Sequence, residues 1–283
     1  MLLQVGPPDA RGRYSLGLAA DYLVPALDVC RTVVAEVNDQ VPWTHSERLL
    51  SEDDFDLLVK SSRPPAQPRQ RPGGELEAAI GRHAAAFIPE DATLEFGVGS
   101  LPEAVCPFLD NRNGLRVHSG TIGDGVAALA RKGIVTSVDC AMLIGSAALF
   151  QFARENDRLR LRSCEYTHGP GTLGGIERFV AVNSAVEVDL GGRVNSEIAG
   201  GSYVGAIGGA PDFVAAANRS PGGVSLILVP ASRLVAKLSG PVTLPASEAG
   251  VVVTELGATD LRGCDAHERA RRLRAIASAH SAI

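Results

Sequence analysis

Residues 91–131 read DATLEFGVGSLPEAVCPFLDNRNGLRVHSGTIGDGVAALAR and decide the fold. Two short β-rich segments, 93–96 and 115–118, are separated by a Gly-rich turn and by a helical pattern that begins near Pro102. A second helical pattern follows over 124–131. A strand, helix, strand order predicts a βαβ unit with parallel strands, which places the chain in the α/β class.

Candidate site residues lie where these predicted strands end. Glu95 is the single acid in its apolar strand and precedes Gly97-Val98-Gly99, and His118-Ser119-Gly120 closes the second strand. The Glu95 carboxylate either points to solvent at the strand end or belongs to a site. Ligands of parallel sheets bind at the carboxyl ends of the strands, so we expect both groups near one edge. His118 is either a ligand contact or a structural histidine. The turn lacks the third glycine of the dinucleotide fingerprint, so we expect no Rossmann cofactor.

Composition describes a well-buried globular protein. The chain has 283 residues, 45% hydrophobic content and a net charge of −5, and no basic run predicts nucleic-acid binding. It contains no signal pattern and no apolar run of membrane-spanning length, so we expect a cytoplasmic location and no membrane partner. The cysteines are scattered and odd in number, which favours reduced thiols, and no metal-ligand spacing or tightly bound cofactor is predicted.

A proline-rich segment divides the chain into expected domains. Residues 62–74 combine proline with polar side chains and glycine, which is typical of a linker. We therefore predict a partial N-terminal domain over 1–61 and a complete C-terminal domain over 75–283.

Two further patterns carry candidate ligand contacts. Residues 186–190 alternate, Gly191-Gly192 forms a turn and 193–197 returns, which predicts a hairpin. Glu187 lies on one face of this hairpin, and its carboxylate faces either solvent or a ligand. Gly205 to Gly209 leads into a helix, so the backbone at Ile207, Gly208 and Gly209 either binds a phosphate or oxyanion or simply makes a tight turn.

Motifs along almost the whole chain resemble the acetyl-CoA hydrolase/transferase family, the branch that includes 4-hydroxybutyrate and acetate CoA-transferases. They are short and occur in the family's order. They comprise Pro7-Pro8-Asp9 with Gly12, Ala35-Glu36-Val37-Asn38 with Pro42, 94–102, Val117-His118-Ser119 with Asp124-Gly125, 183–190 with Val194-Asn195, Ile207-Gly208-Gly209 with Asp212-Phe213, 253–257, and 261–270.

The resemblance implies a fold, a substrate and site residues. It implies CoA-transferase-like α/β domains with open sheets and flanking helices, with the active site between the domains. The substrate is coenzyme A or an acyl-CoA, and the Gly208-Gly209 loop faces it. We expect Gly97 and Gly99 to contact coenzyme A together with Ile207, Gly208 and Gly209. The implied substrate contacts are Ser119, Gly120, Asn183 and Glu187.

The chain departs from the family pattern at its catalytic position. Typical members carry a glutamate after the His-Ser pair, and its carboxylate becomes a glutamyl-CoA thioester. Here that position is Gly120, which has no side chain with which to attack. Glu95 stands where the family has glutamine, and Ala206 replaces a glycine. We therefore expect Glu95 to be the relocated acid, with His118 and Asp124 as further catalytic candidates.

Typical members also carry about another third of a chain before the point that corresponds to Met1. The remaining N-terminal domain would leave sheet edges exposed, and exposed edges pair readily. We expect a separate polypeptide to supply the missing part.

Three functions remain open. The first is a divergent enzyme that hydrolyses or otherwise transforms an acyl-CoA without a glutamyl-CoA intermediate. The second is a non-catalytic binding or scaffold subunit of a CoA-transferase-like complex. The third is a true CoA-transferase in which a partner chain or another acid such as Asp124 replaces the missing nucleophile.

Overall fold

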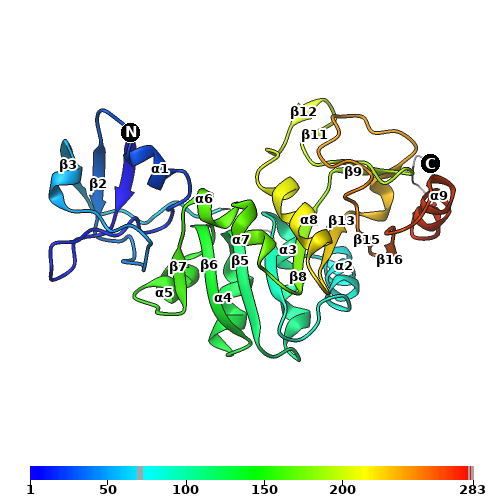
Figure 1. Ribbon diagram of the computed structural model, residues 1–283, viewed down its shortest axis with the longest axis horizontal. Coiled ribbons are helices and arrows are strands. Elements are labelled where there is room, and N and C mark those ends of the chain that lie inside the picture. Colours follow the sequence, from blue (N-terminus) through cyan, green and yellow to red (C-terminus); the bar gives the residue numbers. More distant parts are fainter. Residues whose placement is uncertain (69–72, 280, 282–283) are drawn as a thin grey trace. The chain divides into compact units, whose positions relative to one another are not determined.

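The computed structural model describes residues 1–68, 73–279 and 281. The chain divides into two compact units (Figure 1). The first comprises residues 1–70 and 116–172, and the second comprises residues 71–115 and 173–283.

The first unit contains a three-stranded parallel sheet at its N-terminal end. Its strands are β1 (Leu2–Val5), β2 (Val34–Asn38) and β3 (Leu57–Ser61), in that order. The short helix α1 (Leu23–Leu27) and the 3₁₀ turn η1 (Glu52–Asp54) connect them.

The rest of the first unit alternates strands and helices, as expected from residues 91–131. It contains β5 (Leu115–Ile122), α4 (Asp124–Arg131), β6 (Val135–Leu143), α5 (Ala147–Ala153), β7 (Leu159–Leu161) and α6 (Cys164–Thr167). The strands β6 and β7 are parallel, and α4 packs on β6 and α5. The helix expected over 124–131 is confirmed.

One expectation about this unit is wrong. We placed His118-Ser119-Gly120 at the end of a strand, but β5 continues to Ile122, so the three residues lie inside the strand. Thr121 and Ile122 are β-branched and favour the extended backbone, and Ile122 is buried.

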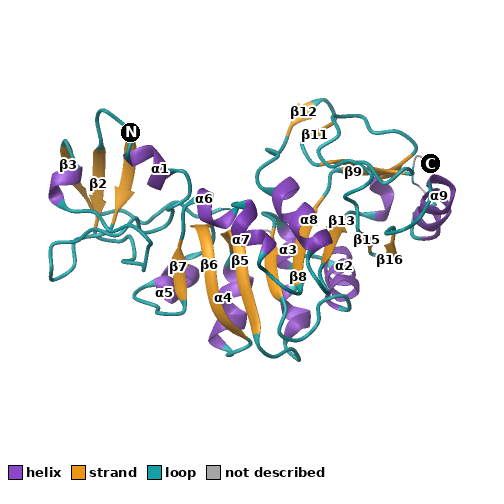
Figure 2. Cartoon of the chain, in the orientation of Figure 1, coloured by secondary structure: helices purple, strands orange, loops and turns teal. Residues whose placement is uncertain are grey.

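The second unit is built on a mostly parallel sheet (Figure 2). Its strands run β16 (Gly257–Asp260), β15 (Val251–Thr254), β13 (Val224–Leu228), β8 (Phe179–Ser184) and β4 (Thr93–Phe96), and only β16 is antiparallel to its neighbour. Helix α8 (Ala210–Arg219) packs on β8 and β13, and α2 (Glu75–Ala85) packs on β13 and β15. Shorter elements are α3 (Ser100–Glu103), η2 (Cys106–Leu109), α7 (Pro170–Gly174) and η3 (Ala231–Arg233).

The predicted hairpin is present in the second unit. Strands β9 (Glu187–Asp189) and β10 (Val194–Asn195) pair antiparallel, and β14 (Leu234–Val235) joins β9. A smaller hairpin joins β11 (Ile198–Ala199) to β12 (Ser202–Tyr203). Buried aliphatic side chains of these strands share one core with α8, β13 and α9.

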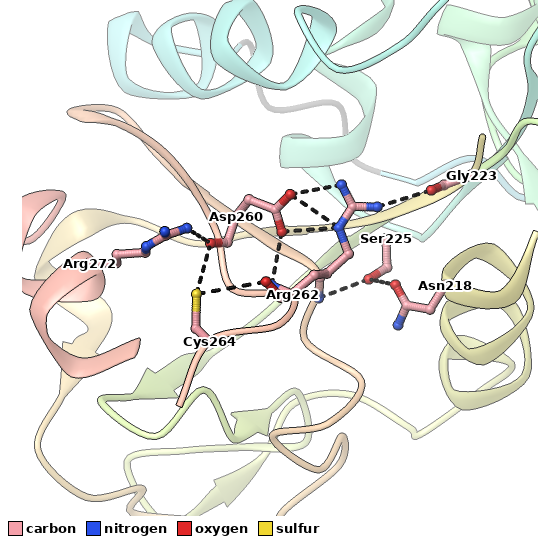
Figure 3. Close-up of polar contacts among 8 residues, drawn as sticks. Asn218, Gly223, Ser225, Asp260, Arg262, Cys264 and Arg272 are labelled. Atoms are coloured by element: carbon pink, nitrogen blue, oxygen red, sulfur yellow. Dashed lines mark hydrogen bonds and ion pairs between the residues drawn. The ribbon is translucent and has the colours of Figure 1, made fainter. Parts of the chain in front are cut away.

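The last helix, α9 (Ala266–Ala275), is held by polar contacts shown in Figure 3. Arg262 pairs with the Asp260 carboxylate at 2.7 Å and donates to the Gly223 carbonyl, and Arg272 donates to the Asp260 carbonyl. Asp265 accepts from the Glu268 N–H at 2.8 Å and is the N-cap of α9.

The described part of the expected linker lies against the first unit. Arg63 pairs with Glu36 at 2.7 Å, and Gln67 accepts from the Ala147 N–H; residues 69–72 lie outside the described residues. The compact units divide the chain differently from the expected domains, since 116–172 groups with the N-terminal segment. The domain boundaries 1–61, 62–74 and 75–283 concern the family's architecture and stay a prediction.

Candidate active site

Glu95 is a buried acid on the sheet of the second unit. Its strand β4 pairs with β8 so that Glu95 stands opposite Ala181, and only 3% of the residue is exposed. Burial raises the pKa of Glu95 to about 8, although hydrogen bonds from Asn183 and the backbone of Val182 oppose that shift. The carboxyl group can therefore gain or lose a proton near neutral pH, as a general acid or base requires.

Asn183 holds this carboxyl group in place. It lies two residues after Ala181 on β8, so both side chains project from the same face of the sheet. Its Nδ2 donates to Glu95 Oε2 at 2.7 Å, and its Oδ1 lies against Gly97, where an added Cβ would come within 2.7 Å. The structure thus brings together three predicted site residues, Glu95, Gly97 and Asn183.

A pocket opens at the carboxyl ends of the same strands. Its volume is about 350 Å³, within the range of small-molecule sites. Its lining comes from the start of α2, the start of α3, the chain after β8 and the chain after β13: Leu76, Glu77, Gly99, Ser100, Leu101, Ser184, Ala185, Val186, Pro230 and Arg233. Ser184 comes directly after Asn183, and Gly99 comes two residues after Gly97. The pocket therefore lies at the ends of β8 and β4, the two strands that carry Asn183 and Glu95.

His118 and Ser119 belong to the first unit and are buried in β5. His118 Nε2 donates to the Thr167 carbonyl at 2.8 Å, and its ring lies 5.8 Å from that of Tyr166. Burial lowers the pKa of His118, so the ring is neutral at pH 7. Ser119 Oγ donates to the Thr121 carbonyl at 2.7 Å. These contacts hold both side chains, and their catalytic and binding roles stay predictions.

Asp124 is joined to a neighbouring helix. Its carboxylate accepts from the Ser146 N–H at 3.0 Å and from Ser146 Oγ at 2.6 Å, and Ser146 is the N-cap of α5. This arrangement fastens the start of α4 to the start of α5. A catalytic role for Asp124 stays a prediction.

Glu187 anchors two loops of the second unit. Its carboxylate accepts from the Ser239 N–H at 2.9 Å, from Ser239 Oγ and from Asn195 Nδ2. Burial raises the pKa of Glu187, but these hydrogen bonds outweigh that effect and the net shift is downward. The residue is mostly buried, so its carboxylate supports the loops around it, and a substrate contact stays a prediction.

The second Gly-rich loop ends at a helix, as predicted. Gly209 is the N-cap of α8, Gly208 has a φ of +55°, and 47% of Ile207 is exposed. A left-handed φ favours glycine, which accounts for Gly208. Binding of coenzyme A by Ile207, Gly208 and Gly209 stays a prediction.

Four polar residues that line the pocket were missed: Glu77, Ser100, Ser184 and Arg233. Ser100 follows the turn after Glu95 and Ser184 follows Asn183, whereas Glu77 and Arg233 adjoin no candidate residue of the sequence analysis. No spacing rule connects segments so far apart in the chain. Only the order of strands in the sheet brings them to one pocket.

The described residues offer no metal site and no membrane-spanning helix. Among the described residues, no group of three or more His, Cys, Asp and Glu side chains is arranged to hold a metal ion. No helix in the described part of the chain is long and apolar enough to cross a membrane.

Known proteins resemble this chain over nearly its whole length. The 4-hydroxybutyrate coenzyme A transferase of Clostridium kluyveri is 34% identical over 98% of this chain and 68% of its own length. The chain belongs to the acetyl-CoA hydrolase/transferase family. The family's C-terminal domain matches residues 145–282.

Other members of the family extend the comparison. The crystal structure of RipA from Yersinia pestis superimposes with a TM-score of 0.94 at 29% identity, covering 98% of this chain and 67% of that one. An acetyl-CoA hydrolase of Kluyveromyces lactis is 25% identical over 76% of this chain and 46% of its own length. The α/β fold is CoA-transferase-like, and the chain spans about two thirds of the length of the transferase and of RipA.

Proposed function

We propose that this member of the family hydrolyses an acyl-CoA and that Glu95 is its general base. The observation that carries the proposal is the buried Glu95 carboxyl group, whose pKa is about 8 and whose strand β4 ends at Phe96, close in sequence to the pocket residue Gly99. Relatives include both CoA-transferases and an acetyl-CoA hydrolase, so water as the acceptor lies within the family's chemistry. Gly120 stands where we expect the family's nucleophile and offers no carboxylate for a covalent intermediate.

The proposed reaction needs only water as co-reactant. The Glu95 carboxylate takes a proton from water while the water oxygen bonds to the thioester carbonyl carbon. The tetrahedral intermediate collapses, the carbon–sulfur bond breaks, and the proton on Glu95 passes to the leaving thiolate. Acyl-CoA and water become the free acid and coenzyme A, and Glu95 is regenerated. Asn183 keeps the carboxyl group oriented throughout.

The test is the substitution Glu95→Gln, which keeps the shape of the side chain and its contact with Asn183. We expect release of coenzyme A from acyl-CoA to fall by about 10²–10⁴-fold, the usual contribution of a general base, while acyl-CoA binding persists. The matched control is Glu103→Gln on α3, outside the pocket lining, which should keep full activity. Unchanged activity of Glu95→Gln would remove Glu95 from the mechanism.

A second candidate is CoA transfer to a carboxylic acid, favoured by the names of the transferase relatives. It requires a substitute nucleophile, such as Asp124 or an acid of a partner chain. Trapping with hydroxylamine followed by peptide mapping separates the two candidates. A modified acidic side chain supports transfer, and a clean map with multiple turnovers supports hydrolysis.

We further infer that a separate polypeptide completes the N-terminal sheet and that the protein is cytoplasmic. The support for the partner is apolar exposure on that sheet: Leu2 is 81% exposed, Leu57 55% and Val59 47%. These three residues lie on its edge strands β1 and β3. The support for the location is that all five cysteines are free thiols.

A further inference from the structure

The turn η3, which carries part of the pocket lining, is held by a carboxylate and a hydroxyl group from elsewhere in the second unit. Pro230 is its N-cap and Arg233 is its last residue, and both line the pocket. The Ala231 N–H donates to Glu255 Oε2 at 2.8 Å, and the Ala231 carbonyl accepts from Ser281 Oγ at 2.6 Å. The N–H and the carbonyl of one fully buried residue are therefore both bound by side chains.

The order of strands in the sheet brings Glu255 to this turn. Strands β13 and β15 are parallel neighbours, and their pairing continues beyond β13, where the Val229 N–H donates to the Val253 carbonyl. Paired parallel strands leave the sheet at the same edge, so the chain after β15 lies beside the chain after β13. Ser281 comes from the chain after α9. Two segments distant in sequence therefore fix the backbone on which Arg233 stands.

Arg233 depends on this backbone because the residue is exposed. A long exposed side chain keeps much of its rotamer freedom, so the position of its backbone decides which region the guanidinium can reach. Burial raises the pKa of Glu187, whereas hydrogen bonds from Ser239 and Asn195 and the positive charge of Arg233 lower it. Since Glu187 follows the lining residue Val186, this attraction draws the guanidinium toward the pocket.

An arginine at the border of the pocket matters to an acyl-CoA, because coenzyme A carries phosphate groups. A guanidinium binds phosphate oxygens through two parallel N–H donors. Such bonds depend on the direction of the donors as well as on the charge, so a displaced arginine binds less well even though it stays charged.

We propose that Glu255 and Ser281 are positioning residues for acyl-CoA binding, and that they hold η3 so that Arg233 meets the ligand at the border of the pocket. Neither residue lines the pocket, so both act through Arg233. The assignment rests on the proposed function because it takes the ligand to be an acyl-CoA, but it does not require Glu95 to be the base. It also connects the chain after α9 with substrate binding.

The experiment measures the affinity of the protein for S-ethyl-coenzyme A, a thioether that cannot be hydrolysed, by isothermal titration calorimetry. We expect Glu255→Ala and Ser281→Ala each to weaken binding about three- to tenfold, the effect of one lost hydrogen bond. Glu255→Gln keeps an acceptor oxygen for the Ala231 N–H and should restore most of the affinity.

A double-mutant cycle tests whether Glu255 acts through Arg233. Arg233→Gln alone should weaken binding at least as much as Glu255→Ala does, and adding Glu255→Ala to it should cause no further loss. A residue that only stabilises the fold would lower Tm in both backgrounds and show no such coupling in affinity.

Thr254→Val is the matched control, because Thr254 Oγ1 donates to the Ile276 carbonyl at 2.9 Å and so joins the same strand to the end of α9 rather than to η3. It should lower Tm and leave the affinity unchanged. Unchanged affinity in Glu255→Ala or in Arg233→Gln, an additive loss in the double variant, or no binding by the native protein would overturn the proposal. If Glu95→Gln keeps full turnover while the cycle holds, the proposed hydrolysis by Glu95 fails and the positioning assignment stands.

Discussion

At the scale of the residue, the environment of Glu95 decides what it can do. An exposed glutamate is ionised at pH 7 and is a weak base. Burial in the sheet raises the pKa of Glu95 to about 8, and the hydrogen bond from Asn183 keeps the carboxyl group in one orientation. The same burial makes the Glu95 carboxylate a stronger base once it is ionised. It also lowers the free energy of unfolding as the pH rises, because the buried carboxylate must then carry a charge.

The first prediction at this scale concerns activity and pH. Only ionised Glu95 accepts a proton from water, so kcat/KM should rise about tenfold per pH unit and level off near pH 8. A pH–rate profile of coenzyme A release measures this. A profile that stays flat from about pH 6 to about pH 9 would show that a group other than Glu95 limits the rate.

The second prediction concerns stability and pH. The unfolded chain ionises Glu95 near its ordinary pKa of 4.5, whereas the folded protein holds the proton until about pH 8. Between these values the unfolded state binds fewer protons, so the free energy of unfolding falls as the pH rises, by several kcal/mol at most, and then levels off. Urea unfolding should show a smaller decline in Glu95→Gln. Identical pH dependence in both proteins would contradict the raised pKa.

What the sequence could predict of the site differs from residue to residue. Glu95 stood out because an acid in an apolar strand is unusual and because the family resemblance placed glutamine there. Arg233 and Glu77 did not stand out, because their meeting depends on the order of strands in the sheet. The partners of Asp124 and Glu187 are side chains remote in sequence, Ser146 and Ser239, which no local pattern identifies.

At the scale of the element, close packing makes Gly81 essential to α2. A glycine inside a helix is ordinarily replaced by alanine with a gain of about 1 kcal/mol. At Gly81 an added Cβ would lie within 2.1 Å of the Ala104 carbonyl oxygen at the C-cap of α3, and backbone cannot swing aside as a side chain can.

We therefore predict that Gly81→Ala destabilises the protein by about 1–3 kcal/mol, the usual cost of overpacking. Gly171→Ala is the control, because that helical glycine has open space around its Cβ position and should be neutral or slightly stabilising. Thermal unfolding of both variants measures the difference. A gain in Tm for Gly81→Ala would show that α2 and α3 do not pack as described.

Elements with a strong local pattern were predicted well. The alternation around the β9–β10 hairpin and the helical pattern of α4 each follow from neighbouring residues. The end of β5 was misplaced because glycine at position 120 looked like a turn, while pairing within the sheet carried the strand onward.

At the scale of the whole molecule, the N-terminal sheet offers edges at which another chain can associate. Its strands β1 and β3 are edges, and Leu2, Leu57 and Val59 expose apolar surface there. Edge strands of this kind invite pairing with another chain. We predict that the chain alone self-associates in light scattering and that Val59→Lys reduces this. A monodisperse monomer would contradict the proposed separate polypeptide.

The account depends most on the claim that no acid of this chain other than Glu95 takes part directly in breaking the thioester. Intact-mass spectrometry during multiple turnovers of acyl-CoA tests it most directly. We predict that coenzyme A accumulates in solution while the polypeptide keeps its unmodified mass. A coenzyme A adduct that maps to any acid of this chain, Glu95 and Asp124 included, would contradict the account.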